Sequence, residues 1–111
     1  MQKEQLTPIL TNYIKDIRQV LAADFSGAKL YGSYARGNFT DESDIDIVIF
    51  TDKMPDEYMN LIEKTADITM NYNLTYDIWI SPVFQNRSLF KQREHAVPYY
   101  QNIEKEGIVL G

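Results

Sequence analysis

The sequence predicts a small α/β (α+β) domain in which a mixed β-sheet of roughly four strands is covered by helices. Three observations support this fold class. The chain opens with an apolar stripe at helical spacing, short apolar segments typical of strands alternate with further helical segments, and turn residues separate them. At 111 residues, with 44% hydrophobic and 24% charged residues, the chain suits a single globular domain spanning residues 1–111.

The first helix is predicted over residues 6–21, where apolar residues recur at steps of three and four. These residues are Leu6, Ile9, Leu10, Tyr13, Ile14, Ile17, Val20 and Leu21. A short apolar strand over residues 28–31 then stops at Gly32, and residues 33–36 open a helical turn before Gly37. We therefore expect a strand, a tight turn and the start of a helix.

Residues 44–50 predict the second strand. Asp44 and Asp46 alternate with apolar residues and should share one face, whereas Ile45, Ile47 and Ile49 should share the other. A second long helix should begin near Pro55, which two acidic residues follow, and should end before residues 71–73. Its expected inward stripe is Tyr58, Leu61, Ile62 and Thr65.

A third strand is predicted over residues 75–80, which are rich in β-forming residues, with Asp77 near its start and a stop at Ser81-Pro82. Residues 84–97 follow no clear pattern. Pro98 and Gly107 bracket a last helix, and a short terminal segment follows over residues 108–110.

Charge and composition narrow the function classes. A formal net charge of −5 argues against binding to the backbone of a long nucleic acid. The chain has no cysteine and only one histidine, His95, so any metal must be held by oxygen ligands, and His95 is read as a surface or packing residue. The N-terminal residues lack the pattern of a secretory signal and no apolar run approaches about 18 residues, so we expect a cytoplasmic protein with no membrane segment.

Gly32 and Ser33 are candidate phosphate ligands. A glycine at the end of a strand allows close approach of the backbone, and the free amides of the next helical turn present partial positive charge to an anion. The alternative is an ordinary turn, because the Lys of a Walker A loop is missing.

Asp44 and Asp46 are candidate metal ligands. On one face of a strand they are separated by roughly 6.5 to 7 Å along the backbone, so their carboxylates can reach one cation or a close pair of cations. Such a pair suits Mg²⁺, which combines a few carboxylates with water and substrate phosphates. The alternative is a solvated strand end whose acidic residues protect a sheet edge.

In combination these features are more specific. The stretch GSYARGNFTDESDIDIVIF places Gly-Ser ten residues before Asp-x-Asp, and an acidic residue opens a later predicted strand. In this order the chain resembles the DNA polymerase beta nucleotidyltransferase superfamily. More closely, the motifs Gly-Ser-Tyr-Ala-Arg-Gly and Ser-Asp-Ile-Asp, together with the short length of the chain, resemble those of the minimal nucleotidyltransferase (MNT) branch. The resemblance covers nearly the whole chain and implies a polymerase-beta-like fold.

The resemblance also implies roles for individual residues. Gly32 and Ser33 would contact the triphosphate, and Asp44 and Asp46 would bind two Mg²⁺ ions. Asp77 would share a metal and help to deprotonate the acceptor hydroxyl, the alternative being a strand residue that caps a backbone group.

Arg36 lies one turn after Ser33, where a guanidinium can pair with phosphate oxygens. A structural salt bridge from Arg36 to Asp41 or Glu42 is the alternative.

Members of the MNT branch pair with helical HEPN proteins, so the resemblance implies an antitoxin that transfers AMP from ATP to a tyrosine of a HEPN toxin. Because the chain is too short to carry a separate acceptor domain, the acceptor surface should come from another chain. Two alternatives stay open: nucleotidylation of a small molecule such as an aminoglycoside with a helical partner subunit, and a non-catalytic antitoxin that masks its partner. Homo-oligomerisation is also left open.

Overall fold

Four strands form one mixed sheet in the order β3-β2-β1-β4 in the computed structural model, which describes residues 2–111. β1 pairs antiparallel with both β2 and β4, whereas β2 and β3 are parallel. The strands are β1 (Gly27–Tyr31), β2 (Ile45–Thr51), β3 (Ile80–Asn86) and β4 (Ile108–Val109). The predicted mixed sheet with helices packed against it is therefore confirmed.

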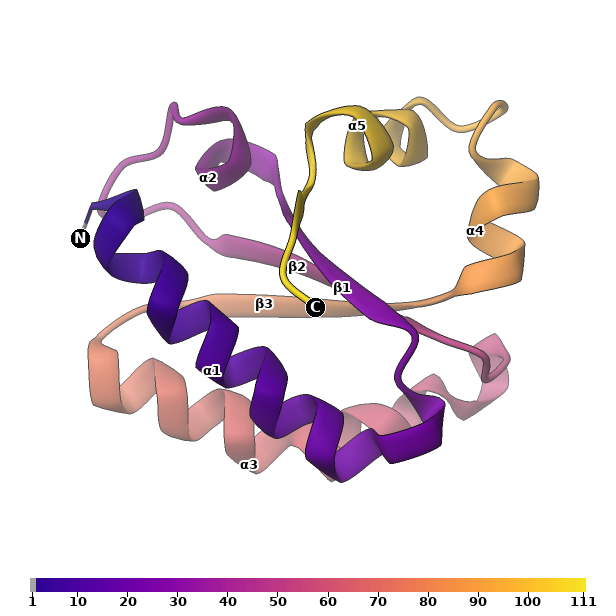
Figure 1. Cartoon of the computed structure of the whole chain (residues 1–111), viewed down its shortest axis with the longest axis horizontal. Helices are drawn as coiled ribbons and strands as arrows, with labels where there is room; N and C mark the ends of the chain where they lie inside the picture. The colour runs from indigo at the N-terminus through magenta and orange to yellow at the C-terminus, as the bar shows by residue number, and fades with distance from the viewer. Residues whose placement is uncertain (1) are drawn as a thin grey trace.

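The long helices lie on one side of the sheet and the short C-terminal helices on the other (Figure 1). The first side carries α1 (Lys3–Leu21) and α3 (Tyr58–Tyr76), and the second carries α4 (Arg87–Arg93) and α5 (Pro98–Glu106). A one-turn helix, α2 (Gly32–Arg36), directly follows β1, and the 3₁₀ turns η1 (Ala22–Asp24) and η2 (Pro55–Glu57) complete the chain. Within residues 2–111 no helix is long and apolar enough to cross a bilayer.

The main core lies between the sheet and the two long helices. The predicted stripe of α1 is confirmed at Leu6, Leu10, Tyr13, Ile14, Ile17 and Leu21, which are buried at helical spacing. Ile9 is only half-buried and Val20 is exposed, so the prediction was wrong at the edges of the stripe. The buried residues of the stripe pack with Ile45, Ile47 and Ile49, the predicted inward face of β2. Alternation along β2 therefore turns Asp46 toward the opposite face of the sheet.

A smaller core fills that opposite face. Val48 and Phe50 of β2 pack there with Phe90 of α4 and Ile103 of α5. The Phe50 and Phe90 rings meet edge to face with their centroids 5.0 Å apart. Asn86 caps α4, since its side chain accepts a hydrogen bond from the Leu89 N–H at 2.9 Å.

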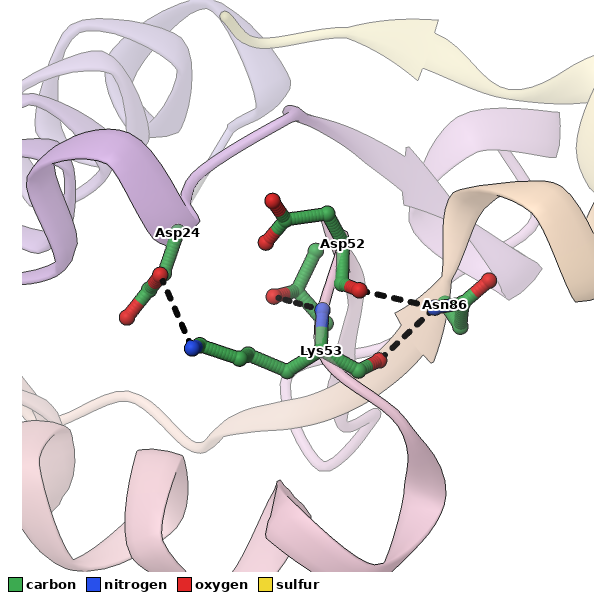
Figure 2. Close-up of polar contacts among 5 residues, drawn as sticks. Asp24, Asp52, Lys53 and Asn86 are labelled. Carbon is green, nitrogen blue, oxygen red and sulfur yellow. Dashed lines mark hydrogen bonds and ion pairs between the residues drawn. The ribbon is translucent and has the colours of Figure 1, made fainter.

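Asn86 also ties the end of β3 to the turn after β2. Its side-chain amide donates to the backbone carbonyls of Asp52 at 3.2 Å and Lys53 at 2.8 Å, and the Lys53 ammonium reaches the Asp24 carboxylate at 3.7 Å (Figure 2). These contacts link three loops at the end of the sheet opposite the Gly32 turn.

The second long helix is longer than predicted. It continues through residues 71–73 to Tyr76, so the predicted end was wrong. Tertiary contacts outweigh the weak helix propensity of this last turn: Tyr72 packs edge to face on Tyr13 with centroids 5.3 Å apart, and its hydroxyl donates to Asp16 at 2.6 Å. The expected inward stripe is confirmed for Leu61 and Thr65, but Ile62 is exposed.

The third strand lies later than predicted. It spans Ile80–Asn86 instead of residues 75–80, and it continues through Ser81 and Pro82. Proline is tolerated because β3 is the last strand on its side of the sheet, where a missing N–H need not break a ladder. The predicted last helix is confirmed as α5, and the terminal segment forms β4.

Candidate active site

The turn after β1 brings the backbone against the paired aspartates. Gly32 adopts φ +74°, a left-handed conformation that favours glycine, and a Cβ at this position would collide with the Asp46 carboxylate. Asp46 lies opposite Tyr31 in the β1–β2 register, which explains the close approach. The first two predicted site elements therefore lie side by side.

Ser33 follows within the single turn of α2. The carbonyl of Ser33 accepts hydrogen bonds from the N–H groups of Gly37 at 2.9 Å and Asn38 at 3.2 Å, which close the turn. Gly37 ends α2 at φ +84°. The first N–H groups of a helix have no hydrogen-bond acceptor within the helix. The start of α2, which lies beside Asp46, therefore carries N–H groups that can bind an anion.

Asp44 and Asp46 are close enough to interact. The pKa of the Asp46 carboxyl is raised, first because the group is half-buried and second because the negative charge of Asp44 is near, while the Arg36 guanidinium partly offsets both effects. A site that raises the pKa of a carboxyl in this way favours a cation beside it.

Arg36 faces the same site from the end of α2. Its guanidinium lies 3.7 Å from the Glu106 carboxylate of α5, a contact between two half-exposed side chains that contributes little to stability. The sequence pattern had suggested Asp41 or Glu42 as salt-bridge partners, and Glu106 was not foreseen. The pairing leaves Arg36 beside Asp46, where it can exchange a carboxylate for a phosphate.

Helix α5 forms a wall that the sequence reasoning missed. The Tyr99 hydroxyl donates to the Tyr31 hydroxyl at 2.6 Å, and burial together with this neighbour raises the pKa of Tyr31. A cavity of about 200 Å³ lies between this wall and the Gly32 turn. It is lined by Tyr31, Gly32, Arg36, Asp46, Tyr99 and Glu106, among others. Ile103 anchors α5 in the smaller core, but no local sequence signal indicates where on the sheet this helix packs.

Asp77 is not where the sequence predicted it. It follows the last residue of α3 in the left-handed conformation (φ 53°), and its N–H caps the Asn73 carbonyl, so it opens no strand. The residue beside Asp46 on the neighbouring strand is Ser81. Asp77 instead lines a second cavity of about 590 Å³, which it shares with Asp44 and Trp79.

The donor set fits a divalent cation on two carboxylates. Asp44 and Asp46 come from one strand end and interact electrostatically, and Mg²⁺ commonly takes one or two carboxylates with water and phosphates. Within residues 2–111 no group of three or more His, Asp or Glu side chains is arranged to hold a metal. The three predicted carboxylates are not gathered at one place, because Asp46 lines the cavity beside the Gly32 turn whereas Asp44 and Asp77 line the second cavity. His95 is 91% exposed and lies away from these carboxylates, on the loop before α5.

Solved structures share this fold. A candidate nucleotidyltransferase from Sulfolobus solfataricus superimposes with a TM-score of 0.64 at 12% identity, covering 96% of this chain and 80% of that one. A toxin–antitoxin structure with AMP-PNP superimposes with a TM-score of 0.57 at 18% identity, covering 91% of this chain and 72% of that one. The sheet, the Gly32 turn and the helices together form a nucleotidyltransferase fold.

Sequence relatives define the family. The polymerase beta nucleotidyltransferase family matches residues 5–110. Two proteins of Methanocaldococcus jannaschii, both named as candidate protein adenylyltransferases, are similar to the chain. One is 34% identical over 85 residues, 77% of this chain and 84% of the relative. The other is 31% identical over 108 residues, 97% of this chain and 92% of the relative. The chain belongs to the polymerase beta nucleotidyltransferase family, and it is a nucleotidyltransferase.

Proposed function

We propose that this nucleotidyltransferase moves AMP from ATP to a hydroxyl of a separate protein, in a reaction that depends on Mg²⁺. The observation that carries the proposal is the contact of the Gly32 turn with Asp46, because it brings a candidate phosphate-binding backbone against a candidate metal ligand. The choice of a protein acceptor is supported by relatives named as candidate protein adenylyltransferases.

In the proposed reaction each residue acts on a different part of the substrates. Asp44 and Asp46 hold Mg²⁺, which supplies charge neutralisation for the triphosphate when it is bound. The backbone of Gly32 and Ser33, together with Arg36, orients the phosphates. The acceptor oxygen forms a bond to the α-phosphorus, the bond between the α-phosphorus and the bridging oxygen breaks, and pyrophosphate leaves.

The proton of the acceptor hydroxyl must go to a base on the acceptor side. Asp77 suits this role, because it lines a cavity of about 590 Å³ next to Asp44, which has room for an acceptor side chain. We therefore assign Asp77 to the acceptor. The family resemblance and the toxin–antitoxin structures of the same fold point to a tyrosine of a helical HEPN toxin as the acceptor.

Intact-mass spectrometry tests the proposal. A HEPN-type protein encoded beside this chain is incubated with the chain, ATP and Mg²⁺, and we expect its mass to rise by one or more AMP groups. Asp44→Asn and Asp46→Asn should each lower the transfer by about 10³-fold or more, as for loss of a group that stabilises transition-state charge. Asp56→Asn, an exposed acid on η2, is the matched control. Unchanged partner mass, with binding and inhibition retained, would identify a masking antitoxin instead.

A further inference from the structure

The outer surface of α3 is the most apolar exposed part of the molecule. Of the ten exposed large apolar side chains in residues 2–111, five lie on α3 and a sixth, Trp79, follows it. Leu74 is 77% exposed and Met70 is 61% exposed. Met70, Leu74 and Trp79 line a groove of about 560 Å³ together with Pro82 and Phe84 of β3. Exposed apolar surface gathered into one groove is typical of an interaction site.

The groove runs along the free edge of β3, where three of the four outward positions have no free N–H for strand addition. The Ile80 N–H donates to the Asn73 side chain at 2.7 Å, and the Asn86 N–H donates to the Tyr58 hydroxyl. Between them, Pro82 has no N–H to offer. Because an added strand needs this row of backbone groups, the groove suits apolar side chains such as those that a helix supplies.

Trp79 connects this groove to the candidate active site. Its side chain is 66% exposed and lines both the apolar groove and the acidic cavity that contains Asp44 and Asp77. A segment lying in the groove therefore ends beside the carboxylates. This placement is what an acceptor protein requires, since its hydroxyl must reach the nucleotide while the rest of the protein is held elsewhere.

We propose that the groove between α3 and β3 docks a helix of the acceptor protein whose apolar face is flanked by Lys and Arg. The inference deepens the proposed function and rests on it. Charge favours a basic occupant, because Asp44 and Asp77 border the groove at Trp79 and the chain carries a net charge of −5. A second copy of this chain would bring the same excess of negative charge to the interface.

Trp79 is the only tryptophan of the chain, so its fluorescence reports on this groove directly. The first probe is a synthetic helical peptide of about 15 residues with Leu at i, i+3, i+4 and i+7 and Lys elsewhere. We expect it to shift the Trp79 emission to the blue in the absence of ATP and Mg²⁺. A peptide with Glu in place of Lys should not. Equal binding of both peptides, or of neither, would overturn the proposal.

Leu74→Glu should weaken binding of the Lys peptide about tenfold or more, as for loss of a central apolar contact. Val20→Glu, at a similarly apolar exposed position on α1, should not change it. If the chain alone is a dimer that Leu74→Glu converts to a monomer, a second copy covers the groove and the proposal is wrong.

The acceptor protein provides the second test. Leu74→Glu should raise the KM for the HEPN-type partner about tenfold and leave the affinity for AMP-PNP unchanged. Full transfer by this variant would overturn the docking surface while the proposed activity stands. Peptide binding at Trp79 without any AMP transfer by the unmodified chain would overturn the activity while the docking surface stands.

Discussion

Gly32 places backbone where any other residue would place a side chain against Asp46. Two constraints act at this position, the left-handed φ of +74° and the contact with the carboxylate, and only the second concerns function. Gly37, five residues later, carries only the backbone constraint, because it has φ +84° and a Cβ there would meet nothing within 4 Å.

We predict that Gly32→Ala lowers the affinity for AMP-PNP and Mg²⁺ by about tenfold or more, since a displaced Asp46 loses interactions of a charged hydrogen-bonding group. Gly37→Ala imposes similar backbone strain, about 1–2 kcal/mol, without touching the carboxylate. Titration calorimetry of both variants checks this. Equal losses in the two would mean that strain, and not the Asp46 contact, decides nucleotide binding.

A second prediction at this scale concerns Asp77. Asp77→Asn should lower the rate of AMP transfer by about 10²-fold, the usual contribution of a general base, without changing the affinity for AMP-PNP and Mg²⁺. Steady-state kinetics and calorimetry on the same preparation separate the two effects. Asp67→Asn on the exposed side of α3 is the control. If Asp77→Asn lowered the affinity for AMP-PNP and Mg²⁺ together with the rate, Asp77 would be a metal ligand instead of a general base.

At the scale of elements, Asn73 connects the end of α3 to the start of β3. The Asn73 side chain accepts a hydrogen bond from the Ile80 N–H at 2.7 Å. This bond spans residues that the sequence pattern predicts to be part of a strand. Asn73→Ala should therefore lower the free energy of unfolding by about 1–3 kcal/mol, the cost of leaving a buried donor without a partner. Denaturant unfolding measures it. Asn71→Ala, exposed on the same helix, should be neutral or slightly stabilising, because alanine has the higher helix propensity.

Elements that their own sequence pattern determines are predicted correctly. The stripe of α1 and the alternation of Ile45, Ile47 and Ile49 gave the right helix and the right strand face. Prediction fails where contacts between distant segments decide. Tyr72 extends α3 by bonding to Asp16, and the parallel pairing with β2 carries β3 through Pro82. For the same reason the sequence indicated that Gly32 and Asp46 lie close together, whereas it put Asp77 on a strand and gave no sign of Tyr99.

At the scale of the whole molecule, the main core holds a tyrosine that couples stability to pH. Tyr13 is fully buried and shares a hydrogen bond of 2.7 Å with Thr69, and burial raises its pKa to about 12. The folded state therefore holds the phenolic proton more tightly than the unfolded state, whose pKa is near 10. The resulting stability is complete below pH 10 and is lost as the pH rises to about 12.

We predict that the free energy of unfolding falls by about 2 kcal/mol over this interval through Tyr13. Tyr13→Phe should flatten the fall, whatever it costs at neutral pH. Urea unfolding at several pH values measures how steeply the free energy of unfolding falls with pH. Tyr58→Phe, which removes the hydroxyl of a less buried tyrosine, is the control. An unchanged slope in Tyr13→Phe would show that other groups carry the alkaline transition.

The position of β4 and α5 has a consequence for biosynthesis. β4 pairs with β1, and α5 supplies Tyr99 and Glu106 beside the Gly32 turn, so one wall of the proposed nucleotide site comes from segments made after β3. Contacts between such distant segments also close late in folding, because the intervening chain must be ordered first. A nascent chain that has only reached β3 already displays both aspartates, yet it cannot enclose a triphosphate. If the proposed site is right, AMP transfer therefore requires that α5 and β4 have left the ribosome and packed on β1.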